Sequence, residues 1–292
     1  MPLFLPLFKV KLIQYPELLQ LTGKWNPPVS RAWLLRLFFG AALGVAMPLA
    51  AENLRVVLEV SPPHQTFENG KVSGLTTAVV ELMLQQAKLT PQYEVYPWAR
   101  AFRLAATTPN VLIYNMARTP EREQQFEWIG KVGSYKFGFL KLAKRQDIQV
   151  QQLKDVHQYV VGAQRDDFSA EWLKNVARQP ASQLQLQPDV VETWRLLVNG
   201  KLDLMLDDPS AIDDMLIKHK LKLAEVEFVL FIPELEQQTW IALKKGSDPK
   251  LIERLRDAYQ QVEGSAELKK VMELGLPQGK GTGFDLVKTS LL

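Results

Sequence analysis

The sequence contains no cysteine, and this absence excludes several classes of site at once. None of the 292 residues can form a disulfide, a thiolate metal site or a cysteine nucleophile. The three histidines, His64, His157 and His219, show no metal-ligand spacing. The Gly-x-Ser-x-Gly elbow, the His-Glu-x-x-His pair and the dinucleotide-binding glycine fingerprint are also missing. We therefore expect no metal, no cofactor and no familiar catalytic motif.

Positive charge is scarce beyond the N-terminal region. Residues 1–51 hold five basic residues against Glu17, a net charge of +4, so the total of +3 leaves −1 for residues 52–292. That remainder has no basic stripe with interleaved aromatic residues. The charge pattern therefore argues against a nucleic-acid partner.

The N-terminal region resembles an export signal. Arg31 and Arg36 precede an apolar run over residues 37–47, and Pro48 and small residues follow up to Ala51. A helix of this length reaches about 16 Å, too short for a hydrocarbon core of about 30 Å. We expect residues 29–51 to be a cleaved signal peptide, residues 1–28 to be an over-annotated extension, and the mature protein to be periplasmic.

Strands and helices alternate from residue 52 onward. Strands are predicted over residues 54–60, 93–96, 111–114, 159–162, 202–206 and 239–243. Helices are predicted after a Thr76 or Thr77 cap, over residues 97–106, 166–173, 190–199 and 249–262, and from a Ser265 cap to Gly275. Short turns between them, such as Asn69-Gly70, predict an α/β fold with parallel crossovers and helices covering a sheet.

The segment 114–130 is the most informative about function. Arg118 and Arg122 follow directly on a short apolar strand, and the end of such a strand is where open α/β sheets bind small ligands. Arginine presents a planar fork of donors that matches a carboxylate. The alternative is a solvated turn with surface ion pairs to Glu121 and Glu123.

Three motifs in order resemble one family. Thr119-Pro-Glu-Arg122 with Trp128 beyond it is similar to a Thr-x-x-Arg block, and residues 200–208 are similar to a Gly-x-x-Asp strand that ends in a ligand-binding acid. Residues 242–249 resemble the segment by which the chain of a two-lobed protein returns to its first lobe. Together, over about residues 53–275, they resemble the periplasmic solute-binding proteins of ABC importers, of the amino-acid-binding type (family 3).

This resemblance implies the type II periplasmic binding protein fold, in which two Rossmann-like lobes are joined by a two-strand hinge. Lobe one would be residues 52–140 and 238–292, and lobe two residues 141–237. The hinges would lie near residues 137–142 and 234–240. Solute would bind in the cleft between the lobes, which expel water as they close.

The resemblance further implies that Arg122 binds an α-carboxylate and Asp208 an α-ammonium group. For Asp208 the alternative is an N-cap of the helix that begins at Pro209. Phe67, Tyr114 and Trp98 are candidate aromatic walls, although core packing is their commoner use. The remaining candidates are Thr119 and Asn115 in the motif segment, and Arg100 and Arg118, which line the cleft mouth or pair with surface acids.

Two departures from the family pattern bear on the solute. Ala117 stands where the family usually has a hydroxyl group. Asp166, Asp167 and Phe168 replace a turn of small residues whose amides approach a carboxylate. Because two acids there would oppose an anion, we expect a polar, partly cationic solute instead of an acidic amino acid.

The sequence therefore predicts a binding protein without enzymatic activity. It would capture an amino acid or related zwitterion as a monomer and deliver it to the membrane permease of an ABC importer. The alternatives are an orphan binding or sensor protein, and a dehydratase-like enzyme on the same fold.

Overall fold

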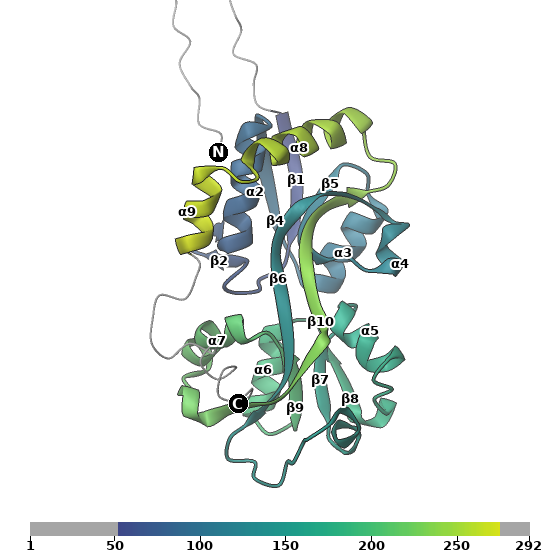
Figure 1. Ribbon diagram of the computed structural model, residues 1–292, viewed down its shortest axis with the longest axis vertical. Coiled ribbons are helices and arrows are strands. Elements are labelled where there is room, and N and C mark those ends of the chain that lie inside the picture. The colour runs from purple at the N-terminus through teal and green to yellow at the C-terminus, as the bar shows by residue number, and fades with distance from the viewer. Residues whose placement is uncertain (1–51, 275–292) are drawn as a thin grey trace, which may run out of the picture. The chain divides into compact units, whose positions relative to one another are not determined.

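The computed structural model describes residues 52–274, and the expected extension, the signal peptide and Gly275 lie outside them. One eight-stranded sheet runs through this part of the chain in the order β4-β1-β5-β10-β6-β9-β7-β8 (Figure 1). Its strands are β1 (Glu52–Leu58), β4 (Leu89–Val95), β5 (Val111–Ala117), β6 (Phe126–Leu142), β7 (Val161–Gln164), β8 (Leu184–Gln187), β9 (Leu204–Asp207) and β10 (Val226–Lys244).

The sheet has a parallel group of strands at each end. Strand β1 pairs in parallel with β4 and β5, and β7 pairs in parallel with β8 and β9. We call the β4-β1-β5 group with its helices lobe one and the β9-β7-β8 group with its helices lobe two. The α/β fold with two lobes expected from the sequence is thus confirmed.

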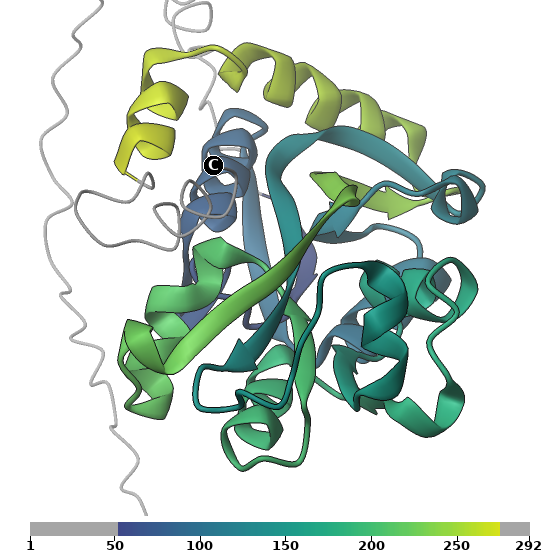
Figure 2. The ribbon, with the colours of Figure 1, turned by 60° about the horizontal axis from the view of Figure 1, so that its bottom comes forward.

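Two long antiparallel strands, β6 and β10, connect the lobes. Near Thr239–Leu243 β10 pairs with β5 of lobe one, and at Gly138–Leu140 β6 pairs with β9 of lobe two. Between these ends β6 and β10 pair with each other, with a break in register between Ile232 and Gln237. Figure 1 shows the two strands running side by side from one lobe to the other, and in the view of Figure 2 they cross.

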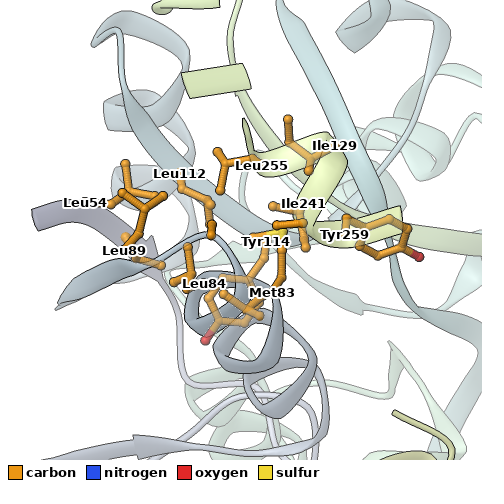
Figure 3. Close-up of a cluster of buried hydrophobic side chains, with 14 of the residues drawn as sticks. Leu54, Met83, Leu84, Leu89, Leu112, Tyr114, Ile129, Ile241, Leu255 and Tyr259 are labelled. Atoms are coloured by element: carbon orange, nitrogen blue, oxygen red, sulfur yellow. The ribbon is translucent and has the colours of Figure 1, made fainter. Parts of the chain in front are cut away.

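Helices cover both faces of each parallel group, which is why the strands are apolar almost throughout. All seven residues of β5 are buried. In lobe one, α2 (Leu75–Gln86) packs beside α8 (Pro249–Val262) and α9 (Ala266–Leu274), and α3 (Trp98–Thr107) contacts β1 and β5. Figure 3 shows the core under α2 and α8, where Met83 and Leu84 meet Leu112 and Leu255.

Lobe two is built in the same way. Its helices are α5 (Phe168–Asn175), α6 (Val190–Val198) and α7 (Ile212–His219), and α5 and α6 contact β7. Short elements complete the described chain: α4 (Pro120–Glu123), the hairpin β2 (Thr66–Glu68) and β3 (Lys71–Ser73), and the 3₁₀ turns η1 (Leu153–Gln158), η2 (Ala181–Gln183), η3 (Pro209–Ala211) and η4 (Leu223–Glu225).

The acidic caps predicted from the sequence are present. The side chain of Asp167 accepts a hydrogen bond from the Ser169 amide at 2.9 Å, and that of Asp248 accepts one from Lys250 at 2.9 Å. Asn69 and Gly70 form the expected turn, with φ values of 51° and 76°. These short-range signals were read correctly because each involves only neighbouring residues.

The predicted threonine cap of α2 was wrong. The helix begins at Leu75 after Gly74, and Thr76 lies inside it and donates to the carbonyl of His64 at 2.9 Å. Gly74 has a φ of 113°, and a Cβ atom there would lie 2.5 Å from the same carbonyl oxygen. A close approach of two backbone segments therefore requires glycine at the helix start.

Candidate functional site

The carboxyl ends of the parallel strands from the two lobes face a common cavity of about 50 Å³. Residues at or just beyond the ends of β1 and β5 line it from lobe one, and residues at or just beyond the ends of β7 and β9 line it from lobe two. Open α/β sheets bind their ligands at such strand ends. We call this hollow the acidic cavity because four carboxylate side chains line it: Glu59, Asp167, Asp207 and Asp208.

Within the described residues, no lysine, arginine or histidine lines the acidic cavity. Its apolar lining includes the aromatic rings of Trp98, Phe137 and Phe168, and the rings of the last two meet edge to face at 5.3 Å. Buried carboxylates without a counter-charge are costly, and aromatic faces attract cations. The surroundings therefore favour a cationic group.

Glu59 follows β1 and is 8% exposed. Its carboxyl group accepts a hydrogen bond from the side-chain amide of Gln164 at the end of β7. Burial raises the pKa of Glu59 to about 8, and the negative charges of Asp167 and Asp189 add to this, while the bond from Gln164 opposes it. Glu59 therefore holds a proton at neutral pH.

Asp207 and Asp208 end β9 and have different surroundings. The carboxylate of Asp207 accepts hydrogen bonds from Nε1 of Trp194 and, at 2.8 Å, from the Asp208 amide. Burial raises the pKa of Asp207 to about 7, although both bonds oppose the shift. Asp208 accepts from the amides of Lys136 and, at 2.7 Å, Ser210, so it is the N-cap of η3 as well as a wall of the cavity.

Asn115 lies beside the acidic cavity near the end of β5, with a φ of 61°. Its Nδ2 donates to the hydroxyl of Tyr135, which lies 3.3 Å from the Ser61 hydroxyl. The Oδ1 of Asn115 has no hydrogen-bond partner in the described part of the chain. A polar network with one unused acceptor thus lies under the cavity.

Arg122 lies in the short helix α4 and is 6% exposed. Its Nη1 donates to the carbonyl of Ala117 at 3.0 Å and its Nη2 to the carbonyl of Asp166 at 3.4 Å. The guanidinium group lies 4.9 Å from the ring centre of Phe102. Burial lowers the pKa of Arg122, and nearby carboxylates, led by Asp167, oppose this shift.

Arg122 does not line the acidic cavity but a larger groove of about 890 Å³, which we call the outer groove. Arg100, Thr119 and Asp166 also line this groove, and Phe168 lines both hollows. Trp98 lines the acidic cavity, and its Nε1 donates to the Asp166 carbonyl at 2.9 Å. The structure thus places Arg122 and Asp208 on different hollows, with Phe168 on the boundary.

Among the described residues, four hydrogen bonds join the two lobes directly around this region, in addition to the bond from the Lys136 amide of the connecting strand β6 to Asp208. Two are the bonds from Trp98 and Arg122 to the Asp166 carbonyl, and a third joins Gln164 to Glu59. The fourth joins Nε2 of His64 to the hydroxyl of Ser210 at 3.2 Å. We refer to them as the cross-lobe contacts. They hold the two lobes together beside the acidic cavity.

The other sequence candidates lie away from the acidic cavity. Arg118 pairs with Glu123 at 2.5 Å and lies 4.8 Å from the Trp240 ring centre, and Arg100 lies 4.1 Å over the Tyr96 ring. Tyr114 is buried in the lobe-one core, with its hydroxyl 2.8 Å from that of Thr77. Phe67 on β2 is 46% exposed. Neither the acidic cavity nor the outer groove, as the described residues form them, is lined by Arg118, Tyr114 or Phe67.

Three residues of the cavity were missed from the sequence. Glu59 lies one residue before the end of the strand predicted over residues 54–60, so the strand-end rule would have found it. Gln164 lies two residues beyond the predicted end of its strand and could have been found in the same way. Tyr135 lies in the middle of β6, which no local pattern revealed.

Two searches of the described residues gave negative results. No group of three or more histidine, aspartate or glutamate side chains is arranged to hold a metal ion among residues 52–274. Among the helices described, none has the length and apolar character to cross a membrane.

Comparison with known proteins identifies the family. The model of the bacterial extracellular solute-binding proteins, family 3, matches residues 54–274. No curated protein matches the chain. Solved structures with the same fold include a histidine kinase sensor domain similar to periplasmic binding proteins, with a TM-score of 0.69 and 16% identity, covering 78% of this chain and 97% of that one.

Two further structures have comparable similarity. An ancestral arginine-binding protein has a TM-score of 0.68 and 18% identity, over 78% of this chain and 99% of that one. A putative L-cystine ABC transporter protein from Listeria monocytogenes has a TM-score of 0.64 and 17% identity, over 79% and 99%. With the family match spanning most of the chain, these results agree with the two-lobed architecture. The chain belongs to the bacterial extracellular solute-binding proteins, family 3.

Proposed function

We propose that the protein captures a small polar solute, an amino acid or related zwitterion with positive charge, between its lobes. The observation that carries this proposal is the acidic cavity, which both lobes line and which has four carboxylates and no basic residue among the described ones. A cation entering it gains ion pairs in surroundings that water barely screens. A solute with only negative charge would meet repulsion from the same groups.

Asp208 is the proposed partner of the solute's ammonium group. Both of its oxygens already accept backbone hydrogen bonds, so its orientation is fixed before the solute arrives. Each carboxylate oxygen can accept a further bond. Neutral Glu59 adds a further hydrogen-bonding group for a polar solute in the same cavity.

Arg122 is the proposed partner of the solute's carboxylate. Its guanidinium group donates to two backbone carbonyls, one in each lobe, and bonds to a carboxylate are stronger than bonds to a neutral carbonyl. A solute carboxylate that replaced the Asp166 carbonyl would lie at the boundary between the outer groove and the acidic cavity. Trp98 and Phe168 would then flank the solute, with Thr119 and Arg100 at the mouth.

We further propose that the solute is delivered to the permease of an ABC importer. Supporting this, solved structures with this fold include a substrate-binding protein of an amino acid ABC transporter. The family is described as extracellular, which supports export of this protein. We propose that residues 29–51 are a cleaved signal peptide and that residues 1–28 are an extension before it. The mature protein would then be a periplasmic monomer. The proposed division puts residues 52–140 and 238–292 in lobe one and residues 141–237 in lobe two.

A sensor is the second candidate function. The histidine kinase sensor domain has this fold, so capture of a solute need not serve transport. Deletion of the gene followed by uptake of labelled solute separates the two, because only an importer component lowers uptake. We propose no enzymatic activity, and recovery of the bound solute unchanged tests this against a dehydratase-like reaction.

A thermal-shift screen of amino acids, polyamines and small peptides tests the proposal. Solute at a hundred times its Kd should add about 2.7 kcal/mol to the free energy of unfolding. We expect stabilisation by basic or neutral zwitterions and none by glutamate or aspartate. Tighter binding of glutamate than of arginine in calorimetry would contradict the proposed solute class.

A further inference from the structure

Glu59 combines two features of the site. Its side chain lines the acidic cavity, where the proposed solute would bind, and it also makes one of the cross-lobe contacts, with Gln164. A change in the charge of Glu59 therefore acts on the solute and on the link between the lobes together.

The groups around Glu59 come from every element packed against it. Tyr135 reaches it from β6, Gln164 from β7, Asp167 from the start of α5, and Asp189 from the start of α6. Asp207 and Asp208, at the end of β9, line the same cavity. Trp98, Ser61 and Asn115 line the cavity from lobe one and also carry polar hydrogens.

The basic side chains near the acidic cavity, Arg122 and His64, already have hydrogen-bond partners in the protein. Arg122 feels the charge of Asp167, but its guanidinium group donates to the carbonyls of Ala117 and Asp166 and lines the outer groove. His64 feels the charge of Asp208, its ring is bonded to Ser210, and burial lowers its pKa, which favours the neutral ring. No cation among residues 52–274 thus compensates a charged Glu59 inside the cavity.

We propose that Glu59 is a proton-exchanging contact: it is protonated when the lobes are joined through Gln164, and it gives its proton to water when a cationic group of the solute enters the acidic cavity. The inference rests on the proposed function, since it concerns the same site. One O–H bond of Glu59 breaks, the proton leaves to the solvent, and an ion pair with the solute forms. The amide of Gln164 can donate to the carboxylate as it does to the neutral group.

The exchange makes capture depend on pH. Below the pKa of Glu59, which is about 8, each rise of one pH unit should strengthen binding of a cation by about tenfold, and above it the dependence should level off. A solute without a cationic group would show no such dependence. Glu59 thus selects for cations and links their capture to the release of about one proton.

Infrared spectroscopy of the full chain, without any solute, tests whether Glu59 is protonated. The carbonyl band of a protonated carboxyl group should be present at about pH 6 and lost by about pH 9, on either side of the Glu59 pKa of about 8. Glu59→Gln should remove the component of this band that titrates near pH 8, Asp207→Asn should remove the component near pH 7, and Glu253→Gln, at an exposed position of α8, should leave both unchanged. A band that is unaffected by Glu59→Gln would overturn the inference.

Calorimetry tests the exchange with L-arginine, L-lysine and putrescine as probes. Titrations near pH 7 in buffers with different heats of ionisation give the number of protons released, expected to be about one for each probe that binds. Glu59→Gln should remove this release apart from the part that Asp207→Asn removes, whereas Glu253→Gln should keep all of it. Asp207→Asn serves as a second comparison, because burial also raises the pKa of that group.

The outcomes separate this inference from the proposed function. Binding of a probe with no proton release, or release that Glu59→Gln does not lower, contradicts the exchange while the proposed solute capture stands. Binding of only neutral or acidic amino acids, with none of the three probes bound even at about pH 9, contradicts the exchange and the cationic solute class together.

Discussion

The Nη2 atom of Arg122 in lobe one lies 3.4 Å from the carbonyl oxygen of Asp166 in lobe two, while its Nη1 holds the carbonyl of Ala117 at 3.0 Å. One guanidinium group thus joins both lobes with neutral acceptors. Because these bonds occupy only part of its five donors, Arg122 has the capacity to accept a stronger, charged partner at the same place.

Replacing Arg122 by alanine should weaken binding of a zwitterion by about 2–5 kcal/mol, because the solute's carboxylate would be left without a partner. Calorimetry with L-arginine and with agmatine, which lacks the carboxylate, measures this. The loss should be confined to L-arginine. Arg195→Ala, which removes an exposed arginine of α6, is the matched control. Equal losses for both compounds in Arg122→Ala would show that the residue acts only by holding the lobes.

Asp208 has two roles that substitution can separate. Asparagine caps helices as well as aspartate does, so Asp208→Asn should keep the cap on Ser210 and lose the bond from the Lys136 amide, which Nδ2 cannot accept, together with affinity for a cation. Asp208→Ala should lose affinity and also about 0.5–2 kcal/mol of stability.

Thermal unfolding and calorimetry on the two variants measure both effects. Asp248→Asn, at the cap of α8 away from the cavity, should change neither quantity. Full affinity for cationic solutes in Asp208→Asn would remove Asp208 from the proposed site.

The pKa of Glu59 predicts how stability depends on pH. Its folded value of about 8 lies above the usual 4.5, so the folded protein keeps a proton that the unfolded chain releases. The contribution of Glu59 to the free energy of unfolding is therefore complete below about pH 4.5 and is lost as the pH rises to about 8. The stability that Glu59 loses over this pH range is on the order of a few kcal/mol, because each unit of pKa difference corresponds to about 1.4 kcal/mol.

Denaturant unfolding of the parent and of Glu59→Gln, followed from about pH 5 to pH 9, checks this sign. Glutamine keeps the bonding shape of the neutral acid but cannot ionise, so the parent should lose stability relative to the variant as the pH rises. Parallel curves for the two proteins would contradict a buried, proton-holding Glu59.

The sequence predicted the local features of this fold better than its long-range ones. The acidic cap at Asp167, the Asn69-Gly70 turn and the start of α8 follow from neighbouring residues. The full lengths of β6 and β10 were not predicted, because each strand is defined by pairing with the other across about a hundred residues of chain.

The site was predicted only in part for the same reason. Asp208 and Trp98 line the acidic cavity as expected of cleft residues, whereas Tyr114 lies in the core. Which face of a strand end meets the opposite lobe depends on tertiary packing, and no periodicity encodes it. Glu59 and Tyr135 become neighbours only through the crossing of β6 between the lobes.

Trp98 offers a test of the cross-lobe contacts that leaves every charge unchanged. Trp98→Phe keeps an aromatic wall but removes Nε1, and with it the bond to the Asp166 carbonyl at 2.9 Å. The remaining cross-lobe contacts must then hold the lobes, and we expect a broader distribution of distances between them. Because the sequence has no cysteine, spin labels at Gln85→Cys in α2 and Lys218→Cys in α7 report that distance without background.

Trp128→Phe, the same change at a lobe-one tryptophan whose Nε1 has no hydrogen-bond partner among the described residues, is the control and should leave the distribution unchanged. We expect the solute that stabilises the parent most to narrow the distribution in Trp98→Phe, since its own contacts with both lobes replace the missing bond. If Trp98→Phe and the parent give the same distribution without solute, the Trp98–Asp166 bond does not contribute to holding the lobes, and the remaining cross-lobe contacts are sufficient.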